Sequence, residues 1–143
     1  MIKGFKTALR VAALASLAGA AAPAMAAGMD PTGLWYDHTG RGAIEIVKCG
    51  EMLCGNLVWV KDPNHKKGCG LQIFGEVQPV AAGRWDNGWI IDPEKDINTK
   101  YSVELTLLSP TSLKVVGYLG TKWLSETMMW QRAPADLKRC RAT

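Results

Sequence analysis

The sequence predicts an all-β fold, an antiparallel up-and-down barrel of about eight strands formed by residues 27–143. Short segments of alternating apolar and polar residues follow one another, with turn residues about every 8 to 12 positions. Tryptophans mark both the first and the last predicted strand, in Gly33-x-Trp35 and Trp130-x-Arg132. This pairing of ends predicts a sheet closed on itself. A two-sheet sandwich is the alternative, but the consecutive hairpins favour the barrel because each strand then neighbours the next.

The first 26 residues have the pattern of a secretory signal peptide. Three basic residues precede an apolar run that is short for a membrane span, and Ala24-Met25-Ala26 fits the small-x-small cleavage pattern. We therefore expect export to the periplasm, with an uncleaved anchor as the alternative. No cysteine follows the cleavage point directly and no later apolar run could span a bilayer, so we expect no stable membrane anchor.

Cleavage would leave one domain of 117 residues. It would remove three of the 17 basic residues and none of the 13 acidic ones, which leaves 14 against 13 and a net charge of +1. Most of the apparent basicity therefore belongs to the signal peptide, and binding to nucleic acid is not expected.

The register of the first predicted hairpin is proposed from its cysteines. Ala43 to Cys49 and Cys54 to Val60 read as strands joined by the turn Gly50 to Leu53. If Cys49 lies directly opposite Cys54, the apolar residues align on the other face, Ile46 opposite Leu57 and Ile44 opposite Trp59.

Four cysteines in an exported chain favour disulfides. Of the three pairings, that register selects Cys49–Cys54, which leaves Cys69–Cys140 to tie a long loop to the C-terminal tail. Four reduced thiols or a zinc site are the alternatives, and the irregular spacing disfavours zinc.

Two further hairpins are predicted after the less legible segment 71–90, where Leu71 to Val77 reads as a strand or a short helix and Arg84 to Ile91 as a strand. In the first hairpin the alternation aligns Leu107 with Leu113, Leu105 with Val115 and Val103 with Gly117. In the second, a three-residue loop from Leu119 to Thr121 places Trp123 opposite Gly117 and Lys114 opposite Glu126.

Five short motifs, in order, resemble domain-of-unknown-function family 2147, a family of small exported bacterial proteins. They are Gly33-x-Trp35, Cys54-Gly-Asn-Leu-Val-Trp59, Ile91-Asp-Pro93 with Lys100-Tyr-Ser102, Gly117-Tyr-Leu-Gly120 and Trp130-x-Arg132, and the resemblance covers residues 32–134. The first and last motifs also resemble those of lipocalin-like (calycin) barrels. That resemblance implies a barrel floor closed by Trp35, with Arg132 packed on its ring in a cation–π contact worth about 0.5–2 kcal/mol. It implies no activity.

No catalytic, cofactor or metal site is predicted. Nucleophilic catalysis needs a nucleophile, a base and an orienting group in reach of one another, whereas His38 and His65 lie in polar turns and no Gly-x-Ser-x-Gly motif is present. Asp92-x-Glu94-x-Asp96-x-Asn98 begins like a calcium loop but lacks its glycine and its closing glutamate. A solvated turn is the expected reading.

Tryptophans and polar residues that share one predicted face indicate a ligand cavity. Trp123, Ser125, Thr127 and Gln131 lie on one side of the last strand, and a fully packed core rarely accepts such polar groups without partners. The predicted lining is Leu57, Trp59, Leu105, Val115, Trp123, Ser125, Thr127 and Met129. In the alternative interpretation, the polar groups bond to neighbouring backbone or face water.

The expected function is therefore a non-enzymatic exported protein that binds a small, partly apolar molecule. A filled barrel with a functional outer surface in the cell envelope is the second hypothesis, and a hydrolase or isomerase the third. Cavity volume separates the first two, since several hundred Å³ favours a ligand.

Overall fold

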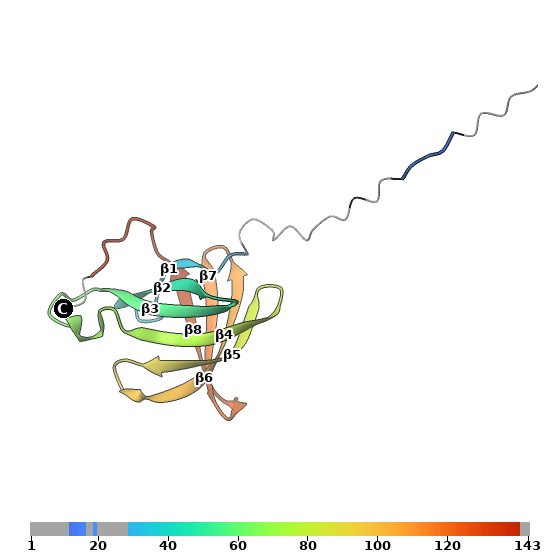
Figure 1. Cartoon of the computed structure of the whole chain (residues 1–143). Coiled ribbons are helices and arrows are strands. Elements are labelled where there is room, and N and C mark those ends of the chain that lie inside the picture. Colours follow the sequence, from blue (N-terminus) through green and yellow to red (C-terminus); the bar gives the residue numbers. More distant parts are fainter. Residues whose placement is uncertain (1–11, 17–18, 20–28, 141–143) are drawn as a thin grey trace, which may run out of the picture.

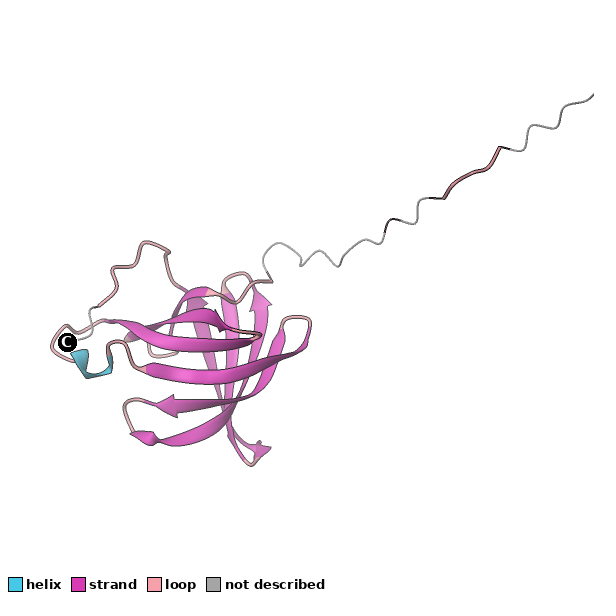
Figure 2. Ribbon diagram, in the orientation of Figure 1, coloured by secondary structure: helices cyan, strands magenta, loops and turns pink. Residues whose placement is uncertain are grey.

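The computed structural model describes residues 12–16, 19 and 29–140, and residues 33–132 form a closed eight-stranded barrel (Figures 1 and 2). Each strand pairs antiparallel with the next, which confirms the predicted fold class. The strands are β1 (Gly33–Tyr36), β2 (Gly42–Cys49), β3 (Met52–Val60), β4 (Gln72–Ala81), β5 (Arg84–Asp92), β6 (Asp96–Ser109), β7 (Ser112–Leu119) and β8 (Thr121–Arg132), with one 3-10 turn, η1 (Lys66–Gly68).

The predicted signal peptide, residues 1–26, lies mostly outside the described residues, which include only 12–16 and 19 of it. Within the described ranges there is no helix with the length and apolar character needed to cross a bilayer.

The barrel closes where β1 pairs with β8, and the predicted pair of residues lies at this seam. Trp35 is opposite Arg132 in the register, and the guanidinium carbon lies 4.1 Å from the centroid of the indole ring. Trp35 is fully buried, and its Nε1 donates to the carbonyl oxygen of Pro31 at 2.8 Å. The cation–π contact expected from the lipocalin-like pattern is therefore present.

Arg132 also ties three separate segments together at this end of the barrel. Its guanidinium donates to the carbonyl oxygens of Thr32 at 2.6 Å, Asp30 at 2.9 Å and Pro110 at 2.8 Å. Burial lowers the pKa of this guanidinium, while the nearby Asp30 carboxylate opposes that shift. A charged group that connects the segment just before β1, the last strand and the β6–β7 turn acts as a clamp on the seam.

The β6–β7 hairpin has the register that alternation predicts. Leu107 lies opposite Leu113, Leu105 opposite Val115, and Val103 opposite Gly117. All of these leucines and valines are buried, because one face of each strand points into the barrel.

The β2–β3 hairpin forms in a different register from the predicted one. Cys49 lies opposite Met52, and Val47 lies opposite Cys54, so the turn is shorter than expected and the disulfide joins diagonal neighbours. An irregularity between Ala43 and Ile44 then leaves Val58 as an extra residue on β3. Such a bulge reverses the direction of the side chains beyond it.

The bulge explains why Trp59 is not where the sequence places it. Ile44 lies opposite Leu57, and both are buried inside the barrel. Trp59 lies opposite Ala43 instead, and its ring meets the edge of Tyr36 at a centroid distance of 5.5 Å in a surface hollow. The prediction that Trp59 points into the barrel is therefore wrong.

The β7–β8 hairpin also differs from its prediction. Gly117 lies opposite Glu126, and Lys114 opposite Met129. The register shifts between Tyr118 and Leu119, where Leu119 pairs with Thr121 around the Gly120 turn. Trp123 lies in the part of the tip that has no paired residue on β7, and its side chain is 94% exposed. The predicted packing of Trp123 over Gly117 is therefore wrong.

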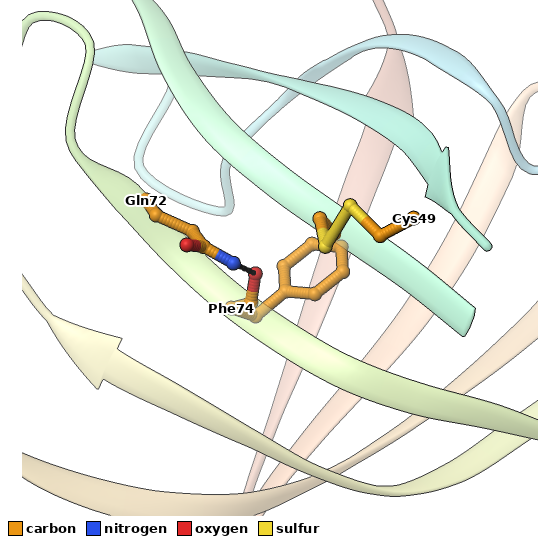
Figure 3. Close-up of a disulfide and its surroundings, with 4 residues drawn as sticks. Cys49, Gln72 and Phe74 are labelled. Atoms are coloured by element: carbon orange, nitrogen blue, oxygen red, sulfur yellow. Dashed lines mark hydrogen bonds between the residues drawn. A yellow bond between two sulfur atoms is a disulfide. The ribbon is translucent and has the colours of Figure 1, made fainter.

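The segment that was hardest to read from sequence forms two long strands, β4 and β5. The short helix considered for Leu71 to Val77 does not form. Phe74 of β4 packs against Gly55 of β3, where a Cβ atom would lie only 2.2 Å from the phenyl ring. Figure 3 shows Phe74 together with the Cys49–Cys54 disulfide and the amide of Gln72, which donates to the Phe74 carbonyl oxygen. Glycine at position 55 is thus required by close packing.

Candidate ligand cavity

One end of the barrel holds a cavity of about 1520 Å³. The loops that surround it are those between β1 and β2, β3 and β4, and β5 and β6, together with the tip of the β7–β8 hairpin. Figure 1 shows that the β5–β6 hairpin and the β7–β8 tip project from the same end of the molecule. We call this the mouth, and the opposite end, where Trp35 meets Arg132, the closed end. Sites for small molecules typically measure about 300–1,000 Å³, so this cavity is large enough to hold one.

The inner wall of the cavity is apolar. Its aliphatic side chains come from five strands, and two aromatic rings join them. These residues are Ile44, Leu57, Ile73, Ile90, Tyr101, Met128 and Trp130. Because alternate residues of each strand point inward, the wall continues directly into the buried core below it. An apolar wall of this kind suits a ligand that is itself largely apolar.

The rim of the mouth is polar, and most of its acidic groups are already paired. Arg41 of the β1–β2 loop reaches Glu94 of the β5–β6 loop at 2.7 Å, which joins two loops that are far apart in sequence. Asp62 pairs with His65 at 2.8 Å in the β3–β4 loop. A backbone hydrogen bond from Asn64 is the main reason why the pKa of Asp62 is lowered, so this carboxylate is ionised at neutral pH.

The segment that resembles the start of a calcium loop forms a hydrogen-bonded turn at the rim. Asp92 accepts from the backbone amides of Glu94 and Lys95, and Asp96 accepts from that of Asn98. No cluster of three or more possible metal ligands occurs in the part of the chain that the structure describes.

The predicted cavity residues divide into three groups. Leu57, Trp123 and Ser125 do line the cavity. Leu105 and Val115 are fully buried in the packed half of the barrel and do not reach it.

The third group lies on the outside, and there the predicted placement is wrong. Trp59 is turned outward by the bulge at Val58. Thr127 pairs with Val116 and Met129 with Lys114 on the outer face, because the β7–β8 register differs from the expected one. Gln131 shares that face and borders the same surface hollow as Trp59 and Met129.

Several lining residues were missed by sequence reasoning. Ile73 and Ile90 belong to segment 71–90, in which possible strands were predicted but no inward face was assigned. An irregularity in the β3–β4 pairing at Ile73 also means that alternation alone would not have identified this residue. Met128, rather than the predicted Met129, lines the cavity because the β7–β8 register differs from the expected one. The hydrophobic pattern could not tell the two apart, since both neighbours are methionines.

Trp130 is buried at the inner wall of the cavity. Its ring lies 6.2 Å from that of Phe74. Its Nε1 is buried without a hydrogen-bond partner among the described residues. It therefore contributes apolar surface to the cavity rather than a paired polar group.

The two disulfides connect Cys49 with Cys54 and Cys69 with Cys140, which is the predicted pairing. The second bond ties the β3–β4 rim loop to the C-terminal tail. This tail follows β8 and is held by two further contacts, the Cys140 amide to the Val58 carbonyl oxygen and Arg139 to Glu45 at 2.6 Å. The longest loop of the rim is thus fixed to the barrel wall.

A charged cluster holds the β7–β8 tip against the outer wall. Lys122 Nζ lies 2.7 Å from Asp86 and 2.6 Å from Glu104, and Tyr118 donates to Asp86 at 2.9 Å. Arg84 also reaches Glu104, at 2.9 Å. Both carboxylates are largely buried, and buried charges are stable only when they are paired in this way.

The cluster stays ionised over a wide pH range. Burial is the largest single influence on Asp86 and Glu104 and opposes their ionisation, but their hydrogen bonds and ion pairs, with Lys122 foremost, together outweigh it and lower the pKa of each carboxyl. The same hydrogen bonds raise the pKa of Lys122. The lysine is therefore charged at neutral pH, and it pairs the tip with both carboxylates of the outer wall.

Comparison with known proteins agrees with this architecture. The model of a family described as "Uncharacterized protein conserved in bacteria (DUF2147)" matches residues 33–132. Among solved structures, a Helicobacter pylori protein, HP1028, described as belonging to the lipocalin family, is similar with a TM-score of 0.62 and 14% sequence identity, over 80% of this chain and 92% of that one. At that identity the likeness shows a shared fold alone. No curated protein sequence matches this chain.

Proposed function

Because the chain belongs to the DUF2147 family of bacterial proteins and folds as a lipocalin-like barrel, we propose that it binds a small, partly apolar molecule in the cavity at its mouth. The observation that carries this proposal is the cavity of about 1520 Å³ with an aliphatic and aromatic inner wall. A barrel that served only as a structural scaffold would be expected to fill this space with side chains. The volume therefore favours a ligand over the alternative of a filled barrel with a working surface.

We also propose that the protein is exported and acts without catalysis. Export is supported by the N-terminal sequence pattern and by two disulfides, which persist in oxidising compartments. Binding without catalysis is supported by the state of the charged groups. The carboxylates with lowered pKa values are engaged in ion pairs or turns, and Asp86 and Glu104 lie on the outer wall, away from the cavity.

Titration with an apolar fluorescent probe tests the proposed binding. N-phenyl-1-naphthylamine should gain fluorescence on entering the cavity of the wild-type protein. Gly117→Leu should weaken this binding by about tenfold or more, because a Cβ at position 117 fits without a clash, 3.7 Å from Ile90, and the added side chain occupies the cavity.

The matched control is Thr127→Leu, which adds apolar volume to the outer face of the neighbouring strand β8. It should leave probe binding unchanged. An equal loss of probe binding in both variants, or a wild type that does not bind the probe, would contradict the proposal. Export is tested separately, since N-terminal sequencing of protein from the periplasmic fraction should begin at Ala27.

A further inference from the structure

Exposed apolar side chains are concentrated at the mouth of the barrel. Five large apolar residues between positions 29 and 140 are more than half exposed, and four of them lie at this end. These four are Ile97 at 53%, Leu119 at 57%, Trp123 at 94% and Leu124 at 66%. The fifth, Leu108 at 54%, lies next to the β6–β7 turn at the closed end. Contiguous exposed apolar groups mark interaction sites, whereas single ones are normal.

The last three of the four belong to one structural unit, the tip of the β7–β8 hairpin. The unit runs from Leu119 to Leu124 around the Gly120 turn, and we call it the apolar tip. Its position is fixed by Lys122, which is bound at 2.7 Å and 2.6 Å to Asp86 and Glu104 of the outer wall. An anchored tip that shows Trp123 almost fully to solvent displays this side chain in a defined position.

The area of the apolar tip argues against a second copy of the chain as its partner. Trp123 can bury at most about 250 Å², and each of the two smaller leucines buries less. The total is below the roughly 800 Å² per partner that a stable protein interface requires. A lipid surface has no such threshold, because a few aromatic and aliphatic side chains can enter it individually.

The rim of the mouth carries charges of both signs. Lys61 and Lys67 of the β3–β4 loop have no ion-pair partner among the described residues, and the same is true of Asp37 and Glu126. The rim therefore has no excess of free positive charge. Exposed Trp and Leu side chains within a polar and charged rim are the composition of an element at a membrane surface.

We propose that the apolar tip docks the protein on a lipid surface with the cavity mouth toward the membrane. Trp123 and Leu124 line the mouth as well as the tip, so their insertion would bring the cavity opening to the lipid. An apolar molecule could then pass between bilayer and cavity without crossing water. The docking is peripheral, and it does not depend on the cavity holding a ligand.

Co-flotation with vesicles of phosphatidylethanolamine and phosphatidylglycerol tests this proposal. The wild-type protein should float with the vesicles. Trp123→Ser and Leu124→Ser should each weaken the association about tenfold, since each removes one inserted apolar side chain. Leu108→Ser is the matched control, because it removes an equally exposed leucine from the closed end, and it should float like the wild type.

Melting curves by circular dichroism should show that all of these variants are folded.

Three outcomes would overturn the docking proposal. They are a wild type that stays with the soluble fraction, an equal loss in Leu108→Ser and Trp123→Ser, or a concentration-dependent dimer that Trp123→Ser abolishes. Gly117→Leu separates docking from ligand binding, since it should float normally while losing the fluorescent probe. If Gly117→Leu floats but the wild type binds no probe, the docking stands and the cavity function fails.

Discussion

The closed end and the mouth are built from the same eight strands, yet one is packed solid and the other is hollow. At the closed end Trp35, Leu105 and Val115 are completely buried. At the mouth the inward positions leave a cavity of about 1520 Å³, and Trp123 is 94% exposed. The difference indicates that the packed half at the closed end supplies most of the stability. The half at the mouth can therefore leave space for other molecules.

Substitution of one tryptophan at each end gives the largest predicted contrast. Trp35→Ala should lower the free energy of unfolding by about 3–5 kcal/mol, because it leaves a void at the seam and removes the ring under Arg132. Trp123→Ala should change it by no more than about 0.5 kcal/mol, as expected for a surface residue. Urea denaturation measures both. Similar losses in the two variants would show that the ends do not differ in packing.

The same contrast explains part of how far the sequence predicts the structure, although the β2–β3 register, whose turn lies at the closed end, was also predicted wrongly. At the closed end, strict alternation predicted the pairing of Leu107 with Leu113 and of Leu105 with Val115, because a slip of one residue would expose every buried side chain. The Trp35–Arg132 contact was implied by the motif resemblance rather than by alternation.

Near the mouth the predictions failed at bulges. The extra residue Val58 turns Trp59 outward, and the shift at Tyr118 moves Trp123 to the hairpin tip. Both faces of these segments carry apolar residues, so hydrophobic pattern alone does not detect the change of face. Alternation also does not separate core from cavity, since Val115 and Ile90 are equally suited to either.

The disulfides offer a second way to compare the ends. The Cys69–Cys140 bond, at the mouth, spans 71 residues, whereas Cys49–Cys54 spans five. The chain-entropy model assigns about 4 kcal/mol to the longer loop and about 2 kcal/mol to the shorter one. The double variant Cys69→Ser, Cys140→Ser should therefore lose more stability than Cys49→Ser, Cys54→Ser. Thermal unfolding measures which variant is less stable, and a larger loss in Cys49→Ser, Cys54→Ser would contradict this account.

Lys122→Met gives a smaller effect at the mouth. It leaves Asp86 and Glu104 largely buried with fewer partners, so the free energy of unfolding should fall by about 1 kcal/mol near neutral pH. The loss is no larger because the lysine itself is half exposed.

The effect of Lys122→Met should depend on pH in a defined direction. The pKa of both carboxyls is lower in the folded state than in the unfolded chain, where it is about 4. Their contribution is therefore present above about pH 4 and is lost as the pH falls through the lowered folded-state values. The difference between wild type and Lys122→Met should shrink in acid. A difference in unfolding free energy that stays constant between neutral and acidic pH would show that the ion pairs do not hold the tip.

Methyl-resolved NMR during titration with N-phenyl-1-naphthylamine tests the central claim most directly, because it reports on both halves of the barrel at once. The methyl resonances of Ile44, Ile73, Ile90 and Met128, which line the cavity, should shift as the probe binds. Those of Leu105, Leu113 and Val115, in the packed half, should stay in place. Shifts confined to the packed half or to the outer-face Met129, with the four cavity residues unchanged, would contradict the existence of a binding site at the mouth.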